Sequence, residues 1–313
     1  MAERESQIVL GLDPDLLSLW PGSGEALGSQ HDIEPFQGGA VPVETGPEER
    51  TAVAVASHCR ALIDATAEAC VAVKLQLARF EVLGRHGLAV ARGLAAYARA
   101  AGLLVIADGK RGDIDVSAAA YAAALTDGIE GPFGPVPGLG ADLLTVNPLM
   151  GRDALEPFLA AARRSGGGVL VLVRTSNPGA ADVEDLELAA GGSVWERIAR
   201  LADELGERGV GESGLSDVGA VLGATRPEHL ARARELMPAA PLLLPGVGAQ
   251  GGRVQELGAA FAAGRAGGLI SASRSISEAH RSSGEAPARA ARAEAERLRE
   301  SAWALSSEVC ATS

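Results

Sequence analysis

The chain is poor in lysine, in aromatic residues and in cysteine. Aromatic residues make up 3% of its 313 residues, so the core must be packed from alanine, valine and leucine. The three cysteines, Cys59, Cys70 and Cys310, form no C-x-x-C pair, and an odd count without a signal peptide fits a reducing cytosol. The first residues carry too short an apolar stretch for a secretion signal, and no run reaches the ~20 residues of a membrane-spanning helix. We therefore expect a cytoplasmic protein without a membrane segment.

Basic clusters are also missing. The chain has 40 acidic and 28 basic residues, which gives a net charge of −12. Proteins that bind nucleic acid carry basic patches that contact the phosphate backbone. The charge balance therefore argues against a nucleic-acid partner.

Lysine is the scarcest of the common charged residues. Of the 28 basic residues 26 are arginine, and Lys74 and Lys110 are the two exceptions. Arginine replaces lysine well on a solvated surface, but its guanidinium stays charged and cannot give up a proton. The two lysines are therefore candidates for proton chemistry, with chance survival as the alternative.

Eight short β-rich runs alternate with longer segments of helical periodicity. Most runs are continuously apolar, as expected of parallel strands that are covered on both faces. The predicted strands are 7–13, 71–75, 103–108, 142–147, 168–175, 218–224, 241–246 and 268–273. The predicted helices include 49–69, 87–101, 153–164, 192–208 and 227–237. This alternation predicts an α/β fold, a (β/α)8 TIM barrel, with a doubly wound sheet as the alternative.

Two segments interrupt the repeat. A Gly- and Pro-rich insertion, 21–48, follows the first strand, and a loop at 176–191 follows the fifth. Both belong at the C-terminal face of a barrel, where binding loops lie. We predict a single barrel domain over 1–277, followed by a helical tail, 278–313, whose charges are solvated.

Charged residues gather where the predicted strands end. Asp13, Lys74, Asp108 and Lys110 all lie at such ends, and catalytic residues of barrels come from these positions. Asp108 and Lys110 are two apart, so both side chains leave the same side of an extended strand. With Asp113 beyond them, alternating acids and lysines can orient a charged lysine as a general acid. An ordinary ion pair at a strand end is the alternative, and Arg111 is expected to point the other way.

A glycine-rich loop, PGVGAQGG at 245–252, follows the seventh strand. Gly246, Gly248 and Gly251 match G-x-G-x-x-G, but no acidic residue follows at the distance that a dinucleotide fold requires. Loops after strands 7 and 8 of barrels bind phosphate, and Arg274 after the last strand supplies a bidentate cation. We therefore interpret this loop as a phosphate site. The five histidines show no metal-ligand spacing.

Together these segments resemble the orotidine 5′-phosphate decarboxylase family, in its longer bacterial (type 2) branch. The resemblance covers about residues 8–277. In chain order it rests on GLDPD, VKLQLARFE, ADGKRGDI, TVNPLMG, LVRTSNPG, LGATRPE, LLLPGVGAQGG and SASRSI.

The resemblance implies a decarboxylase that converts orotidine 5′-phosphate to UMP and CO2 without a metal or other cofactor. Lys110 would donate the proton to C6 of the pyrimidine, within an array that includes Lys74, Asp108 and Asp113. Asp113 would reach into the partner's site of a homodimer.

Substrate contacts follow from the same resemblance. Asp13 would bind the ribose together with Lys74, Ser176 would bind the pyrimidine edge, and Gln250 with Arg274 would hold the phosphate. Ser117 stands where the family usually has threonine, and its hydroxyl can still bond to ribose.

Three other activities remain open. A related metal-dependent phosphosugar enzyme would require Mg²⁺, and an aldolase would form a Schiff base on Lys74 or Lys110. A non-catalytic nucleotide-binding protein would bind UMP without turnover.

Overall fold

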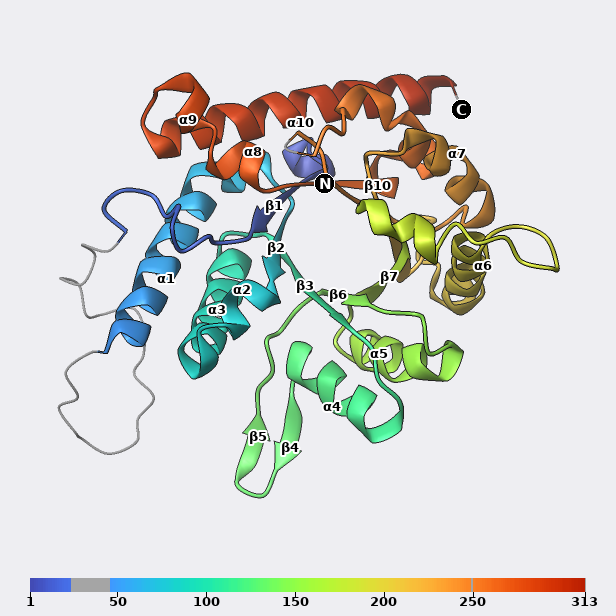
Figure 1. Ribbon diagram of the computed structural model, residues 1–313, viewed down its shortest axis with the longest axis horizontal. Helices are drawn as coiled ribbons and strands as arrows, with labels where there is room; N and C mark the ends of the chain where they lie inside the picture. Colours follow the sequence, from blue (N-terminus) through green and yellow to red (C-terminus); the bar gives the residue numbers. More distant parts are fainter. Residues whose placement is uncertain (24–45, 249, 313) are drawn as a thin grey trace.

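The structure, a computed structural model, describes residues 1–23, 46–248 and 250–312, which contain a closed barrel of eight parallel strands (Figure 1). The strand order around the barrel is β1-β10-β9-β8-β7-β6-β3-β2. Because β1 pairs with both β2 and β10, the sheet has no free edge. The predicted (β/α)8 barrel is confirmed, and the doubly wound alternative, which leaves two open edges, is wrong.

The barrel strands follow the eight predicted runs closely. β3 differs most, because it continues three residues past the predicted end at 108. The strands are β1 (Ile8–Leu12), β2 (Ala72–Gln76), β3 (Leu104–Arg111), β6 (Leu143–Val146), β7 (Gly168–Arg174), β8 (Val218–Leu222), β9 (Leu242–Pro245) and β10 (Gly268–Ala272).

The five predicted helices are present and form much of the layer around the barrel (Figure 1). They are α1 (Pro47–Thr66), α3 (Gly84–Ala100), α5 (Arg152–Arg164), α6 (Val194–Gly206) and α7 (Pro227–Leu236). A capping box, in which Ser193 and Glu196 exchange hydrogen bonds, fixes the start of α6.

Several elements were not predicted. Alanine occupies both faces of α4 (Asp115–Leu125), so this helix has little amphipathic pattern to detect. A hairpin of β4 (Ile129–Gly131) and β5 (Gly134–Val136) follows α4 and lies away from the barrel (Figure 1). The short helices are α2 (Leu77–Glu81), α8 (Arg274–Ser277) and α9 (His280–Ser283). Most of the predicted insertion, residues 24–45, lies outside the described residues.

The predicted tail contains one long helix, α10 (Pro287–Thr312), along one edge of the molecule (Figure 1). Its charged side chains include Arg297, which pairs with Glu294 at the surface. Its opposite face is apolar and belongs to the main core, through Ala291, Ala295, Leu298 and Ala302. Burial of this face stabilises α10 against the barrel. No described helix is long and apolar enough to cross a membrane.

The barrel interior is filled by one buried apolar layer. Its members come from β1, β2, β3, β7, β8, β9 and β10 and include Val9, Ala72, Ile106, Leu170, Val221, Leu243 and Leu269. Side chains two positions further along a strand point to the same side of the sheet. The residues at those positions, toward the C-terminal ends of the strands, therefore stand directly above this layer.

Candidate active site

A pocket of about 390 Å³ lies above the apolar layer, within the ~300–1,000 Å³ range of small-molecule sites. Lys74 and Asp108 follow Ala72 and Ile106 of this layer by two residues on their strands. Their side chains therefore point to the same side of the sheet and enter the pocket above the layer. Further lining residues include Gln76, Thr145, Leu172, Ser271 and Ser273. The polar residues therefore line one pocket that has an apolar base.

Asp108 is the centre of a charged array in this pocket. Its Oδ2 accepts a hydrogen bond from Lys74 Nζ at 2.8 Å, and its Oδ1 accepts one from Lys110 Nζ at 2.6 Å. Lys74 Nζ also lies 3.6 Å from Asp13 Oδ1. Asp108 and Lys74 are buried, whereas the Lys110 side chain is 44% exposed and lines the pocket. Lys110 is thus the lysine more open to a bound molecule.

The pKa values of the buried pair show which charges the array holds. Burial by itself lowers the pKa of Lys74, but Asp13 and Asp108 outweigh this effect, and the pKa is raised. Burial by itself raises the pKa of Asp108, yet Lys74 and Lys110 bring it down to about 2. Both groups are therefore charged at neutral pH, and the array needs no proton shared between them.

Asp113 and Ser117 lie outside the pocket of this chain. Asp113 Oδ1 accepts a hydrogen bond from the Ile114 backbone N–H at 2.8 Å, and Ser117 is exposed on α4. Neither is among the residues that line the pocket. The predicted role of Asp113 in a neighbouring subunit therefore stays a prediction. Arg111 also lies outside, paired with Glu81.

The predicted phosphate end is partly assembled. Gly246, Gln250 and Arg274 line the same pocket as the array. All three loop glycines have positive φ, which favours glycine. The N–H of Gly248 donates to Gly252 O at 3.0 Å, and that of Gly251 to Gly248 O at 2.9 Å. The last two glycines therefore shape the turn, while Gly246 is the one that reaches the pocket.

Ser176 lines the pocket from the loop after β7, together with Thr175 and Asn177. The neighbouring strand end makes room for it, because a Cβ at Gly223 would lie 2.8 Å from the Ser176 Cα. Four further lining residues were not predicted from the sequence: Gln76, Thr145, Asn177 and Ser271. Gln76 could have been found, because it follows Lys74 by two residues on the same strand.

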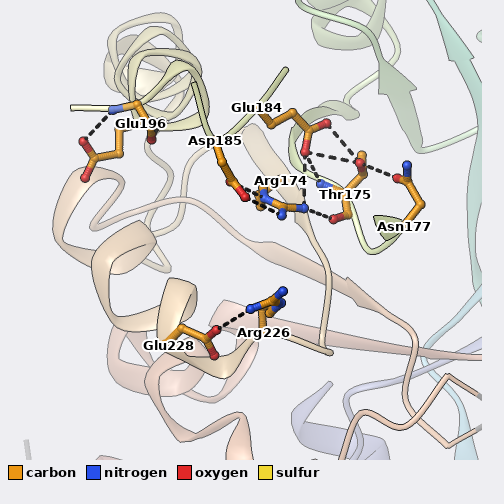
Figure 2. A network of polar contacts seen from close by, with 9 residues as sticks. Arg174, Thr175, Asn177, Glu184, Asp185, Glu196, Arg226 and Glu228 are labelled. Carbon is orange, nitrogen blue, oxygen red and sulfur yellow. Dashed lines mark hydrogen bonds and ion pairs between the residues drawn. The ribbon is translucent and has the colours of Figure 1, made fainter. Parts of the chain in front are cut away.

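A buried arginine fixes the loop that carries Ser176 (Figure 2). Arg174 ends β7 and donates two hydrogen bonds to Asp185, at 2.7 and 2.8 Å, and one to Thr175 O at 2.6 Å. Glu184 accepts from the Thr175 backbone N–H at 2.8 Å. Side-chain bonds thus fasten both ends of residues 175–185, and the bidentate geometry is one that lysine cannot supply.

Metal ligands do not gather in the described part of the chain. No group of three or more His, Cys, Asp or Glu side chains is placed there to hold a metal ion. The side chains that gather instead are the two lysines and their acids, which suit electrostatic and proton-transfer chemistry on an organic anion.

Comparisons with known proteins agree with this arrangement. Residues 6–290 match the model of the family described as "Orotidine 5'-phosphate decarboxylase / HUMPS family". A relative from Rhodopirellula baltica named orotidine 5′-phosphate decarboxylase is 42% identical over 234 residues, covering 75% of this chain and 76% of the relative. A relative of the same name from Deinococcus radiodurans is 47% identical over 216 residues, covering 69% and 74%. The structure of Leishmania donovani OMP decarboxylase superposes with a TM-score of 0.68 at 29% identity, covering 97% of this chain and 96% of that one.

Proposed function

The chain belongs to the orotidine 5′-phosphate decarboxylase / HUMPS family, and from this premise we propose how its pocket works. It is a carboxy-lyase that converts orotidine 5′-phosphate to UMP and CO2. One observation carries the proposed mechanism: Lys110, bonded to Asp108, shares a pocket with Gln250 and Arg274. That pocket offers a proton donor for C6 of the pyrimidine and a cation for the phosphate.

The three free thiols of Cys59, Cys70 and Cys310 support the expected cytoplasmic location.

The reaction breaks the bond between C6 and the carboxylate carbon, and the electron pair stays on C6. This pair lies in the plane of the ring, where no carbonyl can delocalise it, so the stabilisation must come from fixed charges. The Lys110 ammonium faces the developing anion and transfers one proton to C6. Neutral Lys110 then regains a proton from water. Asp108 keeps the ammonium in place before the reaction and repels the departing carboxylate.

Asp13 Oδ1 is buried and accepts no hydrogen bond from the described residues, although the Lys74 ammonium lies 3.6 Å away. A ribose hydroxyl is a donor that would satisfy it, since buried polar atoms are normally paired. Gln250 and Arg274 would bind the phosphate, and Ser176 the pyrimidine edge. Binding energy from the phosphate, far from C6, can then be used to orient the reacting bond.

A homodimer would complete this site. Apolar side chains are exposed on and beside α4 and its hairpin, a surface that water disfavours and that a second copy could cover. They are Ile114, Val116, Tyr121, Ile129, Phe133 and Val136. The same region carries Asp113 and Ser117, so a partner docked there could receive both side chains in its own pocket.

Mixing two inactive variants tests whether the sites are shared. Lys110→Ala and Asp113→Ala should each lose activity, but their mixed dimers contain one site free of both substitutions. Random exchange should restore about a quarter of wild-type activity. The matched control mixes Lys110→Ala with Lys74→Ala. Both residues line the pocket of their own subunit, so each site of this mixed dimer carries one substitution and no activity should be restored. Recovery in the control alone, or in neither mixture, would contradict a shared site.

The activity itself is tested by following the absorbance change as orotidine 5′-phosphate becomes UMP. Full turnover in EDTA is expected and would dismiss a metal-dependent phosphosugar enzyme. Borohydride should trap no adduct with Lys74 or Lys110, which would count against an aldolase. Binding of UMP without any turnover of orotidine 5′-phosphate would refute the proposed function.

Loss of the Arg174 contacts should weaken substrate binding. Arg174→Met keeps much of the buried stem but leaves Asp185 without its donor and Glu184 without its ion-pair partner, so the loop bearing Ser176 loses its fixed position. We expect KM to rise roughly tenfold, with a smaller fall in kcat. Arg163→Met is the matched control, because Arg163 also donates two hydrogen bonds to one acid, Asp217, but outside the pocket. Equal KM values in the two variants would show that the loop needs no such anchor.

A further inference from the structure

Thr145 lies opposite an irregular stretch of β3. The strands β3 and β6 pair at Ala107 with Leu144 and again at Arg111 with Val146, and the register shifts between these pairs. Three residues of β3, 108–110, therefore face Thr145 alone. Such a bulge redirects side chains, and here it contains both Asp108 and Lys110. Thr145 is 1% exposed, so its hydroxyl must find partners inside the barrel.

The bulge forces an unusual backbone at Lys110. Its φ is +49°, in the left-handed region that residues other than glycine rarely adopt. Its backbone N–H donates to Thr145 Oγ1 at 2.9 Å. The ladder resumes beyond it, where the Asn147 N–H donates to Arg111 O at 2.8 Å. At Lys110, the proposed proton donor, a side-chain hydroxyl thus accepts the backbone hydrogen bond that a strand carbonyl would normally accept.

The hydroxyl of Thr145 has a single proton, and its direction is fixed. Thr145 Oγ1 donates to Asp108 Oδ1 at 2.9 Å, so it must accept from the Lys110 N–H. The same Asp108 Oδ1 accepts from Lys110 Nζ at 2.6 Å. The three residues form a closed ring of hydrogen bonds that constrains both ends of Lys110.

We propose that Thr145 is a positioning residue for the reaction, acting through Asp108 and Lys110 rather than on the substrate. Its hydroxyl holds the Lys110 backbone in the left-handed turn and the Asp108 carboxylate at the angle that presents Lys110 Nζ to the pocket. This inference rests on the proposed decarboxylation. Strained backbone that neighbouring bonds hold in place is a known means of orienting reactive groups.

Thr145→Val and Thr145→Ser test the hydroxyl separately from the packing. Valine keeps the branched shape and removes both hydrogen bonds, whereas serine keeps both and removes a methyl group. We expect Thr145→Val to lower kcat about 30- to 100-fold with KM changed less than about twofold, and Thr145→Ser to retain most of kcat. Both are measured with orotidine 5′-phosphate as substrate.

Thr66→Val is the matched control, because Thr66 is equally buried and its hydroxyl donates to Leu62 O away from the pocket. It should lose stability but keep kcat. Should Thr145→Val not fold, Thr145→Cys serves in its place, since a thiol is a weaker donor of similar size. Undiminished kcat in Thr145→Val, or an equal loss in Thr145→Ser, would overturn the role. Wild-type protein without turnover would instead refute the proposed function.

Discussion

Lys110→Arg is expected to lower kcat by about 10³-fold or more while the protein stays folded. Arginine keeps the positive charge beside Asp108, but guanidinium does not release a proton to carbon. Its planar, wider head also cannot occupy the 2.6 Å contact that the ammonium makes with Asp108 Oδ1 without moving. Steady-state turnover of orotidine 5′-phosphate measures the loss, and circular dichroism checks the fold.

Comparison with Lys110→Ala separates charge from proton transfer. Alanine removes both, so any activity that Lys110→Arg keeps above Lys110→Ala reports the electrostatic part alone. Arg152→Lys is a matched exchange in the opposite direction, at an exposed residue of α5 paired with Glu204, and should leave kcat unchanged. A wild-type kcat in Lys110→Arg would show that Lys110 is not the proton donor.

Asp108→Asn is expected to abolish activity and to lower the free energy of unfolding by about 3–5 kcal/mol. The neutral amide cannot compensate the buried ammonium of Lys74, whose remaining acid, Asp13, lies 3.6 Å away. It also cannot accept from Lys74, Lys110 and Thr145 as the carboxylate does. Denaturant unfolding measures the stability and turnover the activity. Asp153→Asn, at the exposed start of α5, is the control and should cost less than about 1 kcal/mol.

The stability difference between wild type and Asp108→Asn should depend on pH in a fixed direction. The folded-state pKa of Asp108 is about 2, below its ordinary value of 3.8, so its contribution is present above about pH 4 and lost as the pH falls toward 2. The pKa of Lys74 is raised above 10.5, so its contribution is complete below that pH and lost as the pH rises through the folded-state value. A difference that grows on acidification would contradict the ionised Asp108.

The barrel was predictable because its signals are local. Each strand is a short apolar run and each of the five predicted helices has an amphipathic period, so both could be found without knowing their neighbours. The helix α4 was missed for the converse reason, since its alanine-rich sequence has no polar face to detect. The buried face of α10 was also missed, because alanine on a charged helix gives a weak apolar stripe.

The scarcity of lysine singled out two residues that line the same pocket, but the abundance of arginine concealed two structural ones. Arg174 anchors the loop beside the pocket, and Arg234 is buried with its guanidinium on backbone carbonyls that include Ala240 O and Ala260 O. Burial lowers the pKa of Arg234 to about 10, so it remains charged at neutral pH. Composition cannot distinguish such residues from surface arginines, because their partners come from distant parts of the chain.

The amino-acid sequence by itself determined the fold class, the two lysines at strand ends and the glycine-rich loop with Arg274. Each follows from residues that are close together in the chain, where alternation, turn preference and residue chemistry apply directly. The tertiary structure alone decided how Lys110 reaches Asp108. Regular alternation predicted that the two side chains share a side, but the contact runs through a bulge with positive φ at Lys110. Within that bulge the Lys110 N–H donates to a hydroxyl 35 residues away, and only the closed barrel brings Thr145 beside it.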